Sequence, residues 1–201
     1  MAMHDLLGDY EAFFSQQLED LKKAGFDLPP LPVSHLAFRT ETYEEYLEAR
    51  AAIESYAQAN VENVWRGRPI SKILLKEPLQ LDADHETSLI ELIPPVHLFD
   101  YPMGLEHVGL VIGETFNAFC EEHKDRFTTT QDQGPYCQPH MMVFDSGFAV
   151  KFYERSLMDV VIMEGRPFDG FHHVDWDPKK QGLEKWRPDQ ITPPHSLAKA
   201  S

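Results

Sequence analysis

The first part of the chain has the apolar spacing of a helix. Leucine, tyrosine and phenylalanine recur every three or four residues from Leu6 to Leu21, which places them on one helical face. Lys22, Lys23 and Gly25 follow, and cations and glycine are typical of helix C-termini. The pattern therefore predicts an N-terminal helix that packs one face against the rest of the protein.

After a proline-rich connector, the pattern predicts a strand, a helix and three further strands. Thr42 and Glu45 form a capping box, a reciprocal pair of hydrogen bonds that opens a helix. Gly67 and Pro69 separate two of the strands, and prolines end the last one. The predicted strands lie near residues 33–39, 61–67, 70–76 and 87–93.

The same order returns after a linker at 96–104. The sequence predicts a strand at 105–112, a short helix at 114–124, and strands near 126–131, 139–144 and 148–154. Such self-similarity is typical of a fold built from tandem units. We therefore expect a single α+β domain over residues 1–164. Its first βαβββ module would span about 30–95 and its second about 104–155.

The end of the chain differs in composition. Ser156 caps a short apolar helix that is predicted through Met163, and residues 165–201 are polar and interrupted by prolines. A segment of this composition buries little apolar surface to offset the entropy of ordering it. We expect this tail to be poorly ordered or draped over the surface, and dispensable for folding.

Four side chains stand at matching places in the two modules. His35 and His107 lie in the first strands, and Glu91 and Lys151 lie in the fourth strands. Alternate side chains of a strand point to opposite faces, so each of these residues shares a face with the residues two positions away. Paired modules would bring two histidines, one carboxylate and one lysine around a shared cavity.

Two histidines and one carboxylate form the pattern of a facial metal triad, which suits iron(II) or a similar divalent ion. The imidazoles supply nitrogen donors, the carboxylate partly neutralises the ion, and further positions stay open for water or substrate oxygens. Two other interpretations remain from the residues alone. A histidine in an apolar strand is often a hydrogen-bonded core residue. A buried Glu91 needs a partner, and Lys151 can form an ion pair with it.

The composition limits the classes of molecule that the protein is expected to bind. The chain has 201 residues, 18 Lys and Arg against 33 Asp and Glu, and a net charge of −15, which disfavours nucleic acid and anionic membranes. No run approaches the roughly 20 apolar residues of a membrane span. The first residues lack a secretory pattern, and Cys120 and Cys137 do not form a disulfide framework, so we expect a cytoplasmic protein.

Short motifs in register add a resemblance to known proteins. The βαβββ repeat, with histidine on the first strand and glutamate on the fourth, resembles the vicinal oxygen chelate superfamily of glyoxalase-type enzymes and extradiol dioxygenases. More narrowly, about residues 1–163 resemble the YecM-like family. The motifs of that resemblance are HLAFR at 35–39, GRPI at 67–70, LKEP at 75–78, IEL at 90–92, EH at 106–107 and VKF at 150–152.

The resemblance implies a fold and a set of site residues. It implies two paired βαβββ units whose curved sheets form a cup, with metal ligands on the first and fourth strands. Those ligands would be His35, Glu91 and His107, and the fourth position departs from the pattern because Lys151 stands where a carboxylate is usual.

Other side chains are candidates for contact with a substrate. Arg39 shares a face with His35 and could hold a substrate carboxylate, and Arg68 sits in a turn that could aim it inward. Tyr153, Lys151 and His140 are candidates for acid–base roles.

We therefore expect a metal-dependent enzyme of the vicinal oxygen chelate type. It would be an isomerase, a lyase or a dioxygenase-like enzyme that acts on a small oxygen-rich or anionic substrate. The expected cofactor is a divalent ion, namely iron, zinc, nickel or manganese. The alternative is a non-catalytic small-molecule binding protein in which an ion pair of Glu91 with Lys151 replaces the metal.

Overall fold

A computed structural model describes residues 2–65, 67–94, 102–131, 133–178 and 180. The helices are α1 (Met3–Leu7), α2 (Tyr10–Lys23), α3 (Tyr43–Glu54), α4 (Phe116–Glu122, after the short 3-10 turn Gly113–Thr115) and α5 (Leu157–Met163). The strands are β1 (Val33–Arg39), β2 (Ala57–Trp65), β3 (Arg68–Gln80), β4 (Glu86–Ile93), β5 (Gly104–Val111), β6 (Thr129–Thr130), β7 (His140–Val143), β8 (Ala149–Tyr153) and β9 (Phe171–His172). No helix in these described ranges is long and apolar enough to cross a membrane.

The two predicted modules are present and share one sheet. The strand order is β6-β7-β8-β5-β1-β4-β3-β2-β9. Within the first module β1 pairs in parallel with β4, and within the second β5 pairs in parallel with β8. The modules meet where β1 and β5 pair antiparallel. The α+β fold of two paired βαβββ units is thus confirmed.

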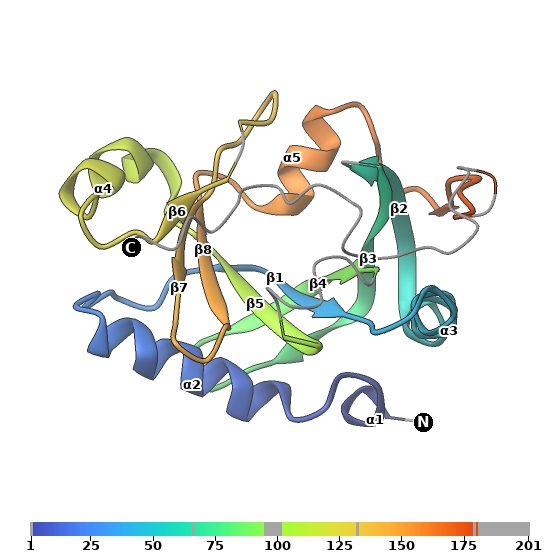
Figure 1. The fold of residues 1–201 in the computed structure, drawn as a ribbon, viewed down its shortest axis with the longest axis horizontal. Coiled ribbons are helices and arrows are strands. Elements are labelled where there is room, and N and C mark those ends of the chain that lie inside the picture. Colours follow the sequence, from blue (N-terminus) through green and yellow to red (C-terminus); the bar gives the residue numbers. More distant parts are fainter. Residues whose placement is uncertain (1, 66, 95–101, 132, 179, 181–201) are drawn as a thin grey trace.

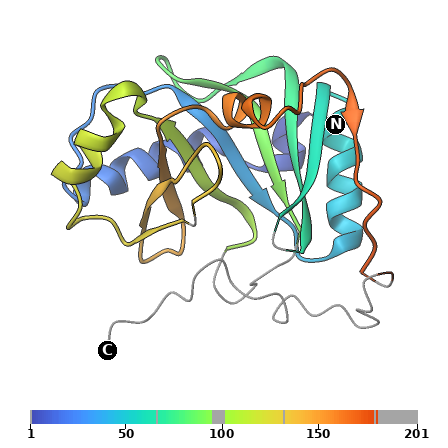
Figure 2. The ribbon, with the colours of Figure 1, turned by 90° about the horizontal axis from the view of Figure 1, so that it is seen from above.

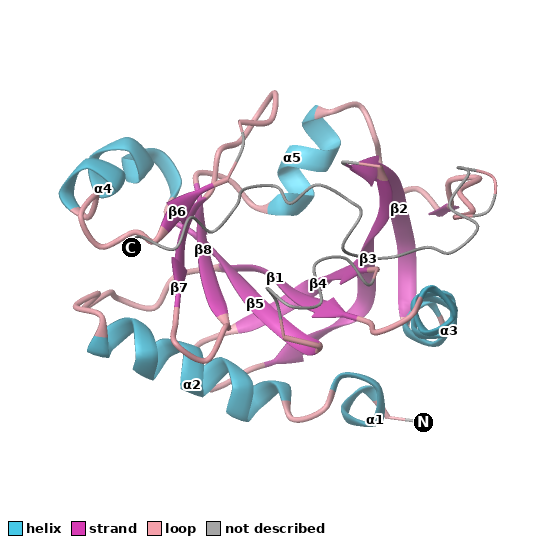
Figure 3. Cartoon of the chain, in the orientation of Figure 1, coloured by secondary structure: helices cyan, strands magenta, loops and turns pink. Residues whose placement is uncertain are grey.

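The sheet curves into a cup. In Figure 1, β1, β4 and β5 form the floor, while β7 and β8 rise on one side and β2 and β3 on the other. Figure 3 shows the helices largely outside the strands: α2 runs beneath the floor and α3 lies outside the wall that contains β2. Helix α5 lies inside the rim, above β1 and β4.

The alternation of side chains gives the floor two different faces. Five apolar residues of the convex face are at most 2% exposed and belong to the same core as the N-terminal helices, namely Leu36, Ile90, Val108, Val150 and Phe152. Burial of this size is the main favourable contribution to folding. The intervening positions point into the cup and carry the polar residues.

The described part of the tail lies along the outer edge of the first module. Strand β9 pairs in parallel with β2, which extends the sheet by one strand at that edge, as Figure 2 shows from above. Trp176 is 7% exposed and donates from its indole nitrogen to the carbonyl oxygen of Gly67 over 3.0 Å. The sequence did not predict this strand, because single anchors of this kind leave no periodic pattern.

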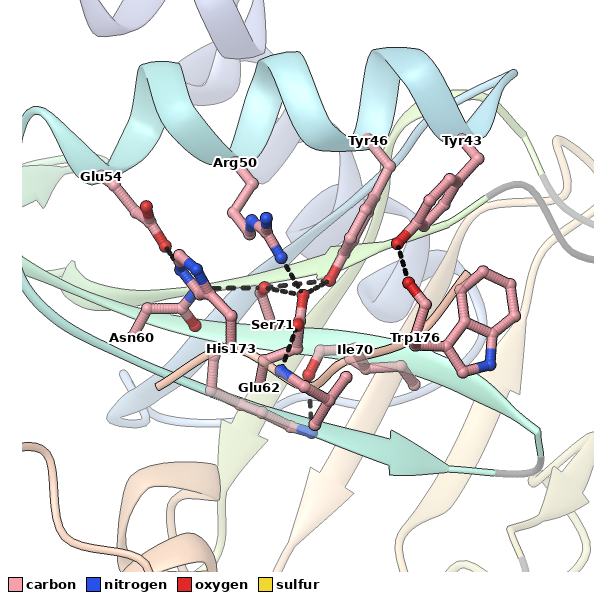
Figure 4. A network of polar contacts seen from close by, with 12 residues as sticks. Tyr43, Tyr46, Arg50, Glu54, Asn60, Glu62, Ile70, Ser71, His173 and Trp176 are labelled. Carbon is pink, nitrogen blue, oxygen red and sulfur yellow. Dashed lines mark hydrogen bonds and ion pairs between the residues drawn. The ribbon is translucent and has the colours of Figure 1, made fainter. Parts of the chain in front are cut away.

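A buried carboxylate connects the tail to α3 and β2 (Figure 4). Glu62 accepts hydrogen bonds from the Tyr46 hydroxyl over 2.6 Å, from Arg50 over 2.7 Å and from the backbone nitrogen of Val174 over 2.8 Å. His173 contacts the Glu54 carboxylate at 2.6 Å. Residues 171–176 therefore form a strap over the wall of the first module. Whether the strap is needed for folding stays a prediction.

Candidate metal centre

Backbone pairing sets the candidate site in two neighbouring rows across the floor of the cup. In one row Glu91 on β4 lies opposite Ala37 on β1, and Ala37 lies opposite His107 on β5. In the next row His35 on β1 lies opposite Gly109 on β5. Residues in register across a sheet share a face, so both histidines and the glutamate point into the cup.

The same pairing makes Lys151 the counterpart of Glu91. Glu91 is opposite the residue two places after His35, and Lys151 is opposite Gly109, two places after His107. The first strands therefore supply equivalent histidines, while the fourth strands supply a carboxylate in one module and an ammonium in the other.

The three predicted ligands converge. His35 Nε2 lies 3.3 Å from His107 Nε2 and 3.7 Å from Glu91 Oε2, and His107 Nε2 lies 3.3 Å from the same Glu91 oxygen. Metal–ligand bonds of about 2.1 Å imply neighbouring ligand atoms about 3.0 Å apart in an octahedral site and about 3.4 Å apart in a tetrahedral one. Two of the three separations lie between these values and the third is slightly longer, so the spacing is close to that of ligands around one divalent ion.

Gly109 makes room for the first histidine. A Cβ atom placed on Gly109 would lie 2.4 Å from Cε1 and 2.6 Å from Nδ1 of His35. Atoms that are not bonded to each other cannot approach so closely, and the His35 ring is fully buried with little space to move. Glycine is required here by the ring that crosses it.

Each histidine is oriented by the residue that precedes it. Ser34 Oγ lies 2.9 Å from Nδ1 of His35, and Glu106 Oε1 lies 3.0 Å from Nδ1 of His107. The other oxygen of Glu106 accepts a hydrogen bond from Nε of Arg39. Partners of this kind orient metal-binding imidazoles and select the tautomer that leaves Nε2 for the metal.

Burial controls the charge of these groups. It lowers the pKa of His35 to about 3, although Glu91 acts in the opposite direction, so this imidazole is neutral at neutral pH. Burial raises the pKa of Glu91, but His107, His35 and Lys151 outweigh it and hold the pKa well below its ordinary value. Burial likewise acts against the charge of Glu106, and Arg39 and His107 still lower its pKa to about 2.

A cavity of about 130 Å³ lies over this site. Glu91 reaches the cavity, whereas His35 and His107 are fully buried at its base. Its apolar walls come from both modules and from α5, including Ile70, Ile93, Met141, Leu157 and Val160. Its charged lining consists of Arg39, Arg68, Lys72, Lys151, Glu91, Glu106 and Glu164. A concave, mostly apolar pocket with a few convergent polar groups is the usual form of a small-molecule site.

The residues predicted to contact a substrate or to act as acid or base differ in where they lie relative to the cavity. Arg39 is buried against Glu106, so it supports His107 through that carboxylate, and it also lines the cavity. Arg68 and Tyr153 are buried and line the cavity as well, so their contact with a substrate stays a prediction. His140 instead packs against the rings of Phe116 and Phe127 and is not part of the lining.

The predicted alternative ion pair is not formed. Within the described residues, Glu91 makes its ion-pair contacts with His35 and His107 and none with Lys151. Burial lowers the pKa of Lys151, although Glu91 and Glu106 raise it. The proposal that a Glu91–Lys151 pair replaces the metal therefore has no support in the geometry.

Three polar residues of the site did not emerge from the sequence. Ser34 and Glu106 orient the histidines, and their signal was their position directly before each histidine. Lys72 on β3 lies opposite Glu91, and its ammonium donates to the side-chain oxygen of Asn63 and, over 3.4 Å, to the carbonyl oxygen of Ile70. Its signal was a lysine on the inward face of an apolar strand.

Comparisons with known proteins agree with this architecture. The family model described as YecM protein matches residues 2–164. Protein YecM from Escherichia coli (strain K12) is 25% identical over 177 residues, covering 81% of this chain and 94% of that protein.

Two solved structures are similar to this chain to different degrees. One described as Structural Genomics, Protein EC4020 has a TM-score of 0.60 and 25% identity, and the match covers 80% of this chain and 93% of that chain. A methylmalonyl-CoA epimerase, solved with methylmalonyl-CoA and NH4+, is more distant. Its TM-score is 0.41 and its identity 10%, over 62% of this chain and 94% of that chain.

Proposed function

We propose that this chain, which belongs to the YecM family, binds a divalent metal ion through His35, Glu91 and His107 and acts on a small oxygen-rich molecule in the cup. The observation that carries the proposal is the convergence of the three ligand atoms, which lie within 4.8 Å of one another. Three protein ligands leave coordination positions open, as in catalytic rather than structural sites.

The hydrogen bonding of His107 supports a cation at this point. Its Nδ1 faces the Glu106 carboxylate, which only accepts hydrogen bonds, so Nδ1 carries the hydrogen. In the neutral ring, Nε2 then holds a lone pair, and that lone pair faces a Glu91 oxygen at 3.3 Å. Two electron-rich atoms at this distance repel unless a positive charge lies between them. A divalent ion, or a proton on His107, provides that charge.

Bound here, a divalent ion would act as a Lewis acid toward two neighbouring oxygens of a substrate and stabilise negative charge that develops on them. The chain supplies the surroundings of that step. The apolar walls lower the effective dielectric constant of the cavity, which strengthens electrostatic interactions inside it. Burial raises the pKa of Tyr153 well above its ordinary value, so its hydroxyl keeps its proton and can donate a hydrogen bond to a ligand.

These features favour an isomerase, lyase or dioxygenase-like reaction on a chelating substrate. Arg68 and Tyr153 are the proposed substrate contacts, and Arg39 is proposed to act through Glu106 on His107. Iron, zinc, nickel and manganese all accept two imidazoles and a carboxylate as ligands. The proposal therefore names the ligand set and these four metals, and does not select one of them.

Metal titration tests this proposal. The protein is stripped with a chelator and then titrated with zinc and nickel by calorimetry. Wild type should bind close to one ion per chain, and His107→Ala should weaken binding by about a hundredfold or more. His140→Ala removes another partly buried strand histidine and should leave binding unchanged. Absence of binding to wild type, or an equal loss in both variants, would contradict the proposal.

A further inference from the structure

Lys151 is a buried cation that has no partner in the described part of the chain. Its side chain is 9% exposed, and among the described residues it makes no hydrogen bond and no ion pair. A buried ammonium is costly unless it is paired or hydrogen-bonded. Its remaining exposed surface faces the cavity that it lines, so the group that is missing belongs in the cavity.

The surroundings of Lys151 indicate the charge of that group. Its neighbour in register is Gly109, which presents no side chain, and the next strand presents Met141. Arg68, which is 5% exposed, lines the same cavity, and its charge contributes to the lowered pKa of Lys151. The carboxylates nearby are engaged elsewhere, Glu91 with the two histidines and Glu106 with Arg39.

We propose that Lys151, with Arg68, forms an anion subsite beside the metal centre that binds a carboxylate of the substrate. This inference rests on the proposed function for the position of the chelating end. The substrate would then be a small molecule with two vicinal oxygens at one end, held at His35, Glu91 and His107, and a separate carboxylate at the other.

The proposal gives a function to Lys151, which stands in the second module where the first module has Glu91. A carboxylate at this position would be a fourth ligand, so it would occupy a coordination position and add negative charge to the cup. A lysine leaves that position open and attracts the anionic end of the ligand. The cavity of about 130 Å³ sets the scale of that ligand, because a cavity of roughly this size holds a molecule such as benzene.

The test compares two ligands of the same shape. Malate carries a chelating hydroxy acid and a second carboxylate; in malamate a neutral amide replaces that second carboxylate. Binding to zinc-loaded wild type is measured by calorimetry. Malate should bind about ten- to a hundredfold more tightly, because its second carboxylate can pair with the Lys151 ammonium, whereas the neutral amide oxygen of malamate can accept only a weaker hydrogen bond.

Substitutions assign that preference to one residue. Lys151→Met should bring the two affinities together, and Lys151→Arg should keep most of the difference. Lys72→Met is the matched control, since it removes the same charge from the same cup, but from an ammonium that already donates to Asn63 and Ile70. It should weaken both ligands to a similar degree and leave their ratio unchanged.

Two further measurements separate the anion subsite from a purely structural role of Lys151 and from the metal site. Without ligand, Lys151→Met should unfold at the same temperature as wild type or higher, since it removes an unpaired buried charge. The ligand comparison is repeated on chelator-treated protein, where the malate preference should persist with weaker affinities. If wild type binds no zinc, the metal proposal fails. The comparison of malate with malamate on metal-free protein still tests whether Lys151 binds the carboxylate. A missing preference in wild type, or one that survives Lys151→Met, would overturn the subsite.

Discussion

The two modules share a backbone topology and differ in the chemistry of their inward side chains. Each places a histidine on its first strand, an orienting residue before it and a small residue two places after it. Their fourth strands differ, with Glu91 in the first module and Lys151 in the second, at equivalent positions in the pairing. The repeated topology places equivalent histidines in both modules, and the fourth strands make the site asymmetric, with a carboxylate from the first module and a cation from the second.

The outer edges of the modules differ as well. The first module ends in β2, which is covered by β9 and the strap. The second module ends in β6, a strand of two residues. Short edge strands and covered edges are two ways to limit unwanted strand pairing. Each difference between the modules can be removed by mutation, which leads to the following expectations.

The largest effect should come from making the fourth strands alike. Lys151→Glu would place a second carboxylate in the cup with Glu91. Without metal, the repulsion and the unpaired buried charge should destabilise the protein by about 3–5 kcal/mol. With zinc, a fourth ligand should recover most of that loss. Urea unfolding with and without zinc measures both. An equal cost in the two conditions would show that Lys151 does not occupy a ligand position.

The small residues beside the histidines should respond unequally. Gly109→Ala would displace the His35 ring and weaken zinc binding by about 10- to 100-fold, as loss of ligand orientation does in other metal sites. Ala37→Gly, the counterpart change in the first module, should cost only about 0.5–1 kcal/mol of stability. Calorimetry and thermal unfolding of both variants provide the comparison. Unchanged zinc affinity in Gly109→Ala would mean that His35 is not a ligand.

The next largest effects should come from substituting the residues that orient the histidines. Glu106→Gln removes a charge that faces both His107 and Arg39, so it should weaken zinc binding by about tenfold or more and lower stability. Ser34→Ala removes only neutral hydrogen bonds, one with Nδ1 of His35 and one that the hydroxyl accepts from the backbone nitrogen of Leu157 over 2.7 Å, so it should weaken zinc binding less than Glu106→Gln does. The zinc dissociation constants of the two variants give the ranking, and the reverse order would contradict the roles assigned to them.

The smallest effect on zinc binding should come from removing the strap, which lies at the outer edge of the first module. A chain that ends at residue 164 loses Trp176 and the hydrogen bond from Val174 to Glu62, so we expect a loss of about 1–2 kcal/mol. It should still fold, as the composition of the tail predicted. A chain that ends at residue 177 keeps these contacts and is the control. Equal melting temperatures for both would show that the strap adds no stability.

The sequence by itself determined the order of the elements as far as α5 and the inward faces of β1, β4 and β5. Apolar periodicity is a local property, so it predicted the tandem βαβββ units and the inward direction of His35, Glu91 and His107. The repeat then supplied the reason for distant residues to meet. The correct prediction of their convergence needed no knowledge of distances, because equivalent strands of paired modules lie side by side.

Only the tertiary structure decided which side chains touch. Register and sheet curvature determine whether Lys151 reaches Glu91, and here the histidines hold that carboxylate while Lys151 faces the cavity. The need for Gly109, the contact of Arg39 with Glu106 and the anchoring of the strap have the same origin. Each joins residues from separate segments through one or two contacts, and such contacts leave no periodic trace in the chain.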